Sequence, residues 1–316
     1  MRVPPDARIQ QHGTAAARAY ARSLRRPKSN TWYGDYDPRS WRVAATQIRE
    51  QHLGIDDVRR AGSILRSARS SGRYLCALPR SGTNWLFAMI NGAMSLHHGG
   101  DGTFELVPDR TPAGDDEWVF AGPRYGWPAL PRGFAMALAK DADRPVGETV
   151  FLYGHEPLPQ GLLDYRRSRP VVSVRDPFAA ASSLVLKDGL EWTLAEPGRL
   201  EAAADRVERF FSVWEQRLAD PATAERSVVL VYEQLREDPL AGLLAVNRLW
   251  ALGIDQRTWE DAIERCSWRS MEQVVGERRD TMRISLGAVD LPAEVEGYLR
   301  ERCDRIGARL LQRTAR

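Results

Sequence analysis

The chain has 316 residues, of which 43% are hydrophobic and 28% charged, a composition typical of a globular protein that excludes a fibrous or intrinsically disordered one. Its formal net charge of +3 is small, so we expect an anionic small-molecule ligand rather than nucleic acid. No run approaches the ~18 apolar residues of a membrane span, and the N-terminus lacks the apolar stretch of a signal peptide. We therefore expect a cytoplasmic protein.

Cysteine and carboxylate patterns give no sign of a metal site. Cys76, Cys266 and Cys303 are far apart in the chain, and no CxxC pair is present. This spacing supports neither a zinc site nor a disulfide framework. No cluster of carboxylates suggests a required metal either. We expect the three cysteines to be reduced and mostly buried.

The first part of the chain, residues 1–70, is rich in Arg, Ala and Ser. Apolar residues in 15–24 and 41–52 have helical spacing, so we predict a mostly helical N-terminal extension. The main domain is predicted to span residues 71–316.

That domain begins with a short apolar run, residues 73–78, that Pro79 ends; this predicts a buried strand. A loop of small residues follows, and apolar residues from Trp85 to Ala93 then recur at helical spacing. Residues 97–148 carry many Gly, Pro and aromatic residues with weak periodicity, and we interpret them as irregular.

Strands and helices alternate in the rest of the chain. We predict strands at 149–153, 171–174 and 227–231, and helices at 178–187, 200–219 and 239–252. This alternation indicates an α/β fold, with a parallel sheet flanked by helices through right-handed crossovers. Ligands of such sheets bind at the carboxyl ends of the strands.

The loop after the first strand has the residues of an anion cradle. Free N–H groups at a helix start attract anions, Gly82 permits a tight turn, and Arg80 adds a positive charge. Ser81, Thr83 and Asn84 are further donors. A nucleoside triphosphate loop would read G-x-x-x-x-G-K-[ST], and this loop lacks both the first Gly and the GK[ST] ending.

A second basic residue, Arg175, follows the predicted strand at 171–174. Asp176 and Pro177 come next, and Ser183 lies eight residues after the arginine, within the predicted helix. Alone, this string is also consistent with a salt-bridged turn.

Residues 79–86 resemble the 5′-phosphosulfate-binding loop of sulfotransferases that use 3′-phosphoadenosine 5′-phosphosulfate (PAPS). That loop reads P-[KR]-S-G-T-T-W-L, and this chain differs from it only at Asn84. The resemblance implies the sulfotransferase fold, with a P-loop-like parallel sheet, and places Arg80 on the bridging oxygen of the leaving phosphate. It implies stacking of Trp85 on adenine, and it assigns the rest of the 5′-phosphosulfate contacts to Ser81, Gly82, Thr83 and Asn84.

The resemblance extends to two further motifs and fails at a third. The family's 3′-phosphate site reads R-[DN]-P with a Ser eight positions after the Arg, which Arg175 and Ser183 match. Residues 232–239 are similar to Y-E-[DE]-[LM]-x-x-[DN]-P, so Tyr232 is the residue implied to contact the base, although closing the core would also explain it. The family's R-K-G-x-x-G-D-W segment is missing, and its nearest candidate here is Arg283 or the earlier pair Arg278-Arg279.

The candidate general base is His155, which follows the predicted strand at 149–153. The family carries its base in a K-T-H-[LFA]-P string at this point, and here the string reads Tyr153-Gly154-His155-Glu156-Pro157. The resemblance implies that His155 takes the proton of the acceptor hydroxyl, with Glu156 as the fallback.

The expected activity is transfer of a sulfuryl group from PAPS to a hydroxyl of a small-molecule, lipid or glycan acceptor. Two alternatives stay open: a nucleotide kinase-like phosphotransferase of the P-loop type, and a catalytically silent nucleotide-binding module. The acceptor pocket is expected among aromatic residues, which would equally serve as core: Phe104, Trp118, Phe120, Tyr125 and Trp127.

Overall fold

The computed structural model describes residues 56, 59, 63, 70–100, 102, 105–110, 116–121, 125–128, 151–155, 167–187, 198–266, 291–306 and 309–312. The extension predicted over residues 1–70 lies almost entirely outside these residues, and the domain division at residue 70 stays a prediction. The described residues fall into two compact units. One lies within Met1–Leu75 and Tyr125–Arg169, and the other within Cys76–Arg124 and Pro170–Arg316.

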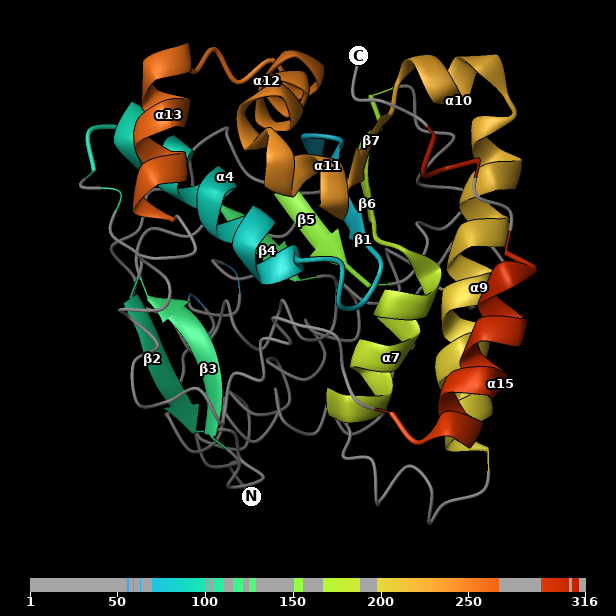
Figure 1. Ribbon diagram of the computed structural model, residues 1–316. Helices are drawn as coiled ribbons and strands as arrows, with labels where there is room; N and C mark the ends of the chain where they lie inside the picture. The colour runs from blue at the N-terminus through green and yellow to red at the C-terminus, as the bar shows by residue number, and fades with distance from the viewer. Residues whose placement is uncertain are drawn as a thin grey trace, which may run out of the picture. The chain divides into compact units, whose positions relative to one another are not determined.

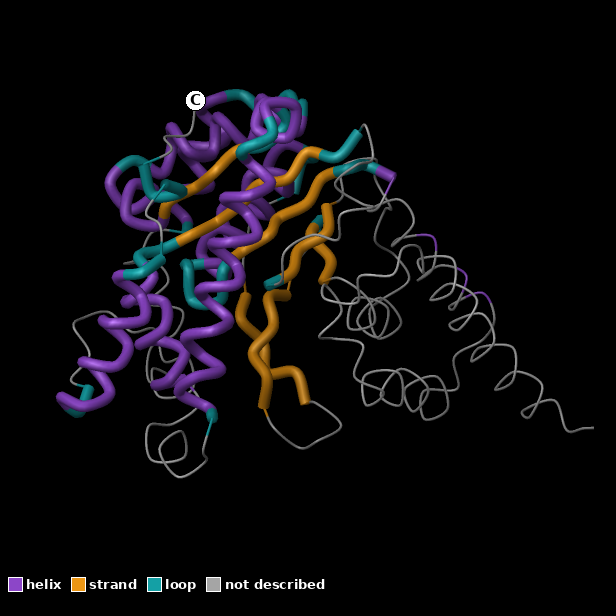
Figure 2. The backbone as a smooth tube through the Cα atoms, turned by 90° about the vertical axis from the view of Figure 1, so that its right-hand side faces the viewer, coloured by secondary structure: helices purple, strands orange, loops and turns teal. Residues whose placement is uncertain are grey.

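A parallel sheet forms the centre of the fold (Figure 2). Its strand order is β4-β5-β1-β6-β7, and the four strands β5, β1, β6 and β7 all run parallel. The bounds are β4 Gly126–Pro128, β5 Phe151–Gly154, β1 Arg73–Ala77, β6 Arg169–Val174 and β7 Val228–Val231. The predicted α/β class, with strands near residues 73, 151, 171 and 228, is therefore confirmed. Strands β1, β6 and β7 are almost wholly buried, as is typical of parallel strands covered on both faces.

Helices of the second unit form two groups (Figure 1). In the first, α4 packs on α13 and α12 packs on α11, α13 and β7; in the second, α9 packs on α7, α10 and α15. The first group comprises α4 Thr83–His97, α11 Tyr232–Glu237, α12 Pro239–Trp250 and α13 Gln256–Arg265. The second comprises α7 Pro177–Lys187, α9 Arg199–Leu218, α10 Pro221–Glu225 and α15 Ala293–Asp304.

Apolar spacing and capping residues account for these helices. The predicted apolar side of α9 is buried, with Val207, Phe210, Phe211, Trp214 and Leu218 all at most 2% exposed. Aspartates cap several of the described helices; Asp220, Asp238 and Asp255 accept backbone N–H bonds at the starts of α10, α12 and α13. Pro221 and Pro239 stand at the first turn of α10 and α12, where a missing N–H costs nothing.

The C-terminal helix α15 is held against α7 and α9 by arginines. Arg302 bonds Asp205 and Glu208 of α9, each at 2.6 Å, and the guanidinium of Arg300 lies 4.1 Å from the ring centre of Phe178 in α7. Cys303 of the same helix is buried, which raises the pKa of its thiol to about 11. The predicted burial of the cysteines is confirmed for all three.

The interpretation of residues 97–148 as irregular is wrong in part. Strands β2 Glu105–Arg110 and β3 Asp116–Ala121 pair antiparallel, and β4 joins the parallel sheet beside β5. Pro108 pairs with Trp118 in the two-stranded sheet, which is composed of edge strands, and edge strands tolerate proline. The strand signal was weak because pairing with a second strand, rather than local periodicity, produces these elements.

Two helical glycines have opposite surroundings and give a test of the packing. A Cβ at Gly242 of α12 would lie 2.8 Å from Leu235 Cδ1 and 3.3 Å from Leu230 Cδ2, whereas a Cβ at Gly297 of α15 would meet nothing within 4 Å. We expect Gly297→Ala to raise the free energy of unfolding by about 0.5–1 kcal/mol, because alanine is the better helix former. In Gly242→Ala, crowding by the two leucines should cancel that gain. If the chemical denaturation midpoint of Gly242→Ala is at least as high as that of Gly297→Ala, the packing of α11 and β7 on α12 is contradicted.

Candidate anion-binding site

The loop between β1 and α4 has the backbone geometry of an anion-binding nest. Arg80 has φ 69° and Gly82 has φ 73°, so two left-handed residues flank Ser81. Turns of this kind gather successive backbone N–H groups into a concavity that binds anions. The loop is anchored at its start, because the Leu78 N–H donates to the Ser173 carbonyl at 2.8 Å and the Ser81 N–H donates to the Leu78 carbonyl at 3.1 Å.

The N-terminus of α4 carries no cap of its own. Gly82, at the cap position, supplies no side chain, and the first turn has no acidic residue. The first hydrogen bond within the helix runs from the Leu86 N–H to the Gly82 carbonyl. The N–H groups of residues 83–85 precede it and therefore have no acceptor within the helix. Thr83 is 7% exposed, and its hydroxyl has no hydrogen-bond partner among the described residues. These groups together fit a phosphate or sulfate group at the positive end of the helix.

The backbone of this loop is strained and is held by buried hydroxyls. A non-glycine residue with positive φ, such as Arg80, costs about 1–3 kcal/mol. Ser81 is fully buried, and its Oγ lies 3.1 Å from Ser173 Oγ in β6. Breaking that pair would leave buried hydroxyls without partners, at a cost of about 1–3 kcal/mol each. The sequence suggested Ser81 as an anion donor, but in the structure its hydroxyl and its N–H both hold the loop in place.

The ring of Tyr232 covers Gly82. A Cβ at Gly82 would lie 2.5 Å from Tyr232 Cδ2 and 2.6 Å from Cε2, so no larger residue fits there. Positive φ and close approach therefore both require glycine at this position. Tyr232 begins α11, directly after β7, and is thus brought onto the loop with which the sequence associated it.

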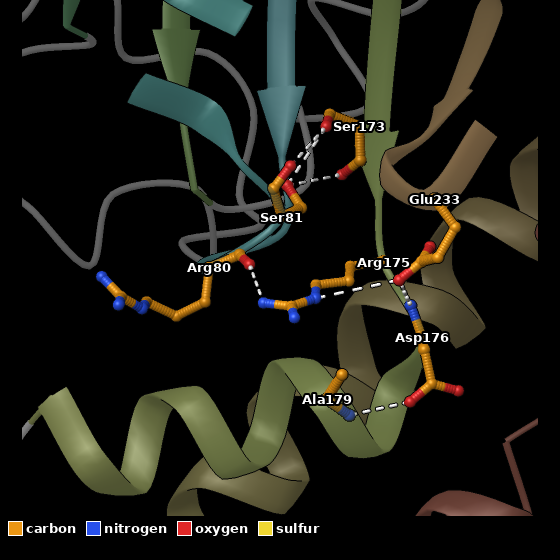
Figure 3. A network of polar contacts seen from close by, with 7 residues as sticks. All are labelled: Arg80, Ser81, Ser173, Arg175, Asp176, Ala179 and Glu233. Carbon is orange, nitrogen blue, oxygen red and sulfur yellow. Dashed lines mark hydrogen bonds and ion pairs between the residues drawn. The ribbon is translucent and has the colours of Figure 1, made fainter. Parts of the chain in front are cut away.

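The two basic residues predicted from separate motifs come together. The Arg80 Nε donates to the Ser183 Oγ at 2.8 Å, and the Arg175 Nη1 donates to the Arg80 carbonyl at 3.3 Å. Figure 3 shows the Arg80 side chain extending away from Arg175 while its carbonyl faces the Arg175 guanidinium. The residues that the sequence assigned to two phosphate contacts thus form one hydrogen-bonded group at the carboxyl ends of β1 and β6.

The Arg175 guanidinium lies over an aromatic ring. Its Cζ is 4.8 Å from the ring centre of Tyr232, a cation–π contact, and its Nε is 3.8 Å from the Glu233 carboxylate. That Nε has no hydrogen bond, so the contact with Glu233 is an ion pair only. The next residue, Asp176, accepts the Ala179 N–H at 2.8 Å and thereby caps α7.

Trp85 is fixed by its own indole. Its Nε1 donates to the Cys266 carbonyl at 2.9 Å, and its ring meets Tyr232 edge to face at 6.4 Å between ring centres. Both rings are partly exposed, beside the uncapped helix start. The Cys266 thiol is buried, which raises its pKa to about 12, so only its carbonyl contributes here.

The other predicted site residues are less fully described. His155 directly follows β5, its side chain is exposed, and it belongs to the first unit, whereas the residues above belong to the second. The side chain of Asn84 and all of Arg283, Phe104 and Glu156 lie outside the described residues. Tyr125, one of the aromatic candidates for the acceptor pocket, is half-buried, and burial raises its pKa.

Two residues of the site were not singled out from the sequence. Ser173, the last residue but one of β6, is 1% exposed, and Glu233 links Arg175 to the N–H of Asp176. Ser173 was detectable as the one polar residue in the apolar run 171–174. Glu233 has no signal of its own in the sequence beyond its place directly after Tyr232 in the motif.

Within the described ranges, no group of three or more His, Cys, Asp or Glu residues could hold a metal ion. None of the described helices combines the length and apolar character needed to cross a membrane. Comparison with protein-family models and comparison with curated proteins each found no match.

The strain at Arg80 gives a test of the loop geometry. Arg80→Ala and Arg80→Gly both remove the guanidinium and its bond to Ser183, but only glycine adopts positive φ without cost. We expect Arg80→Gly to be more stable than Arg80→Ala by about 1 kcal/mol in urea denaturation.

Ala251 is the matched control, because it is the other described non-glycine residue with positive φ (48°) and is exposed at the end of α12. Ala251→Gly should gain a similar amount over the wild type. If Arg80→Ala is as stable as Arg80→Gly while Ala251→Gly is more stable than the wild type, Arg80 does not have the left-handed conformation.

Proposed function

We propose that this chain transfers a sulfuryl group from PAPS to an acceptor hydroxyl. The observation that carries the proposal is the hydrogen-bonded group of Arg80, Ser183 and Arg175 beside the uncapped start of α4. A ligand with two separate anionic groups suits two adjacent basic loops, at the ends of neighbouring parallel strands, better than a ligand with one.

The residues present fit the 5′-phosphosulfate group of this substrate. The N–H groups at the start of α4 and the buried Thr83 hydroxyl, which has no partner among the described residues, would bind its oxygens. Arg80 would stabilise the charge that develops on the leaving phosphate. A nucleoside triphosphate fits less well, because Thr83 follows Gly82 where a triphosphate loop has its lysine.

The remaining contacts are assigned by the motifs and supported by their surroundings. Arg175 and Ser183 would bind the 3′-phosphate, and the partly exposed rings of Trp85 and Tyr232 would contact the adenine. The Tyr232 ring covers Gly82 and meets the Trp85 ring, so a base that contacts both rings would be close to the anion loop.

In the proposed reaction the acceptor oxygen attacks sulfur in line with the leaving phosphate oxygen, in the loose manner of phosphoryl transfer. A bond from the acceptor oxygen to sulfur forms and the bond from sulfur to the phosphate oxygen breaks, which leaves adenosine 3′,5′-bisphosphate. The acceptor proton passes to His155, the base that the motif after β5 suggests. A positioned base of this kind contributes a factor of about 10²–10⁴ in rate.

Nucleotide binding distinguishes the proposal from a kinase-like activity. We expect adenosine 3′,5′-bisphosphate to raise the melting temperature, and ATP with Mg²⁺ to have little effect. Arg175→Ala should weaken binding of the bisphosphate about ten-fold or more, since a hydrogen bond to a charged group contributes about 1.5–3 kcal/mol.

Arg236→Ala is the matched control for that measurement. It removes an exposed arginine whose guanidinium also lies over Tyr232, at 5.9 Å, and it should change binding little. A chain stabilised by ATP with Mg²⁺ and not by the bisphosphate would favour the kinase-like alternative.

The role of His155 is tested by transfer itself. With PAPS supplied, mass spectrometry of candidate hydroxyl compounds should detect the mass gain of one SO₃ group. His155→Ala should lower the rate for any modified compound about 10²-fold or more while binding the bisphosphate like the wild type. Normal transfer by His155→Ala would refute its role as base, and bisphosphate binding without transfer to any compound would favour the silent nucleotide-binding module.

A further inference from the structure

The carboxylate of Glu233 lies beside the Nε of the Arg175 guanidinium. Glu233 is the second residue of α11, and its Oε1 is 3.8 Å from Arg175 Nε and 3.3 Å from the Asp176 backbone nitrogen, whose N–H donates to it. Figure 3 shows the carboxylate reaching across from α11 to both residues at the end of β6. One side chain of α11 thus fixes both the arginine and the backbone that follows it.

Three contacts determine how the guanidinium is oriented. Glu233 lies beside Nε, the Arg80 carbonyl accepts from Nη1 at 3.3 Å, and the centre of the Tyr232 ring is 4.8 Å from Cζ. Within the part of the chain that the structure describes, the third nitrogen, Nη2, takes part in no hydrogen bond or ion pair. In this orientation the two N–H groups of Nη2, at one end of the planar guanidinium, remain to bind an anion.

The N-terminus of α7 is poorly placed to bind an anion instead of Arg175. Asp176 already accepts the Ala179 N–H there, and its carboxylate occupies the positive end of the helix. A second negative charge, that of Glu233, is also close by. An incoming phosphate at the end of β6 would thus depend on Arg175, and a long arginine side chain loses considerable rotamer entropy unless it is held beforehand.

We propose that Glu233 is a positioning residue that orients Arg175 for the 3′-phosphate and so sets the preference for a 3′-phosphorylated nucleotide. The proposal rests on the proposed function, because it concerns the 3′-phosphate of the same substrate. Glu233 acts through the arginine. It is exposed enough, with 47% of its side chain accessible, to be replaced without opening the core.

The test compares two nucleotides that differ only in the 3′-phosphate. Calorimetry would measure the dissociation constants of adenosine 3′,5′-bisphosphate and of adenosine 5′-monophosphate for the full chain. Glu233→Gln retains an oxygen that can accept the Asp176 N–H, but it loses the charge that faces Arg175. We expect its melting temperature to match the wild type while the preference for the bisphosphate falls by a factor of up to about five, the most that a partly exposed ion pair usually contributes.

Two further variants separate positioning from a general effect on charge or structure. In an Arg175→Ala background, Glu233→Gln should lower the preference no further, because residues that act through one another are not additive. Glu237→Ala removes the same charge from an exposed position of the same helix and should leave the preference unchanged.

The possible outcomes distinguish this proposal from the proposed function. If the wild type prefers the bisphosphate and Glu233→Gln keeps that preference, the role of Glu233 is refuted and the proposed function stands. The same holds if Glu233→Gln lowers the preference as much in the Arg175→Ala background as in the wild type. If the wild type shows no affinity for the bisphosphate, both are refuted.

Discussion

The buried hydroxyl contact between Ser81 and Ser173 is the interaction on which the candidate site depends. It ties the loop after β1 to the neighbouring strand β6, and the two serines are 92 positions apart in the chain. The cost of breaking it is comparable to the strain of the left-handed Arg80, so the fold can maintain a turn that the chain alone would avoid. From this turn follow the direction of the loop N–H groups and the position of the Arg80 carbonyl that Arg175 contacts.

The second layer of the site consists of side chains that restrain one another. Tyr232 closes on Gly82, carries the Arg175 guanidinium on its ring and meets Trp85 with its edge. Trp85 is in turn held by the Cys266 carbonyl at the end of α13. Residues from β6, α4, α11 and the end of α13 thus determine the geometry of one short loop. Preorganisation of this kind lowers the entropy that a bound anion must overcome.

Electrostatics divides the site into two unlike parts. The start of α4 is uncapped and lacks acidic residues, so its partial positive charge remains available to a ligand. The start of α7 is capped by Asp176 and has Glu233 nearby, so an anion there would be bound through side chains, Arg175 among them. One part is therefore suited to bind anions through backbone N–H groups, and the other through a side chain whose orientation matters.

The sequence by itself determined the α/β class, the buried strands and the long amphipathic helix α9, because apolar periodicity and Pro or Gly breaks are local signals. It also predicted that Arg80 and Arg175 would follow strands, since each motif directly continues an apolar run. Only the tertiary structure decided that Ser81 turns its hydroxyl to Ser173, that Arg80 bonds Ser183, that Glu233 faces Arg175, and that β2 pairs with β3. The long-range contacts of the site join residues 57–181 positions apart, and the β2–β3 pairing depends on a partner strand. No pattern within one segment specifies such contacts, because packing between distant elements selects them.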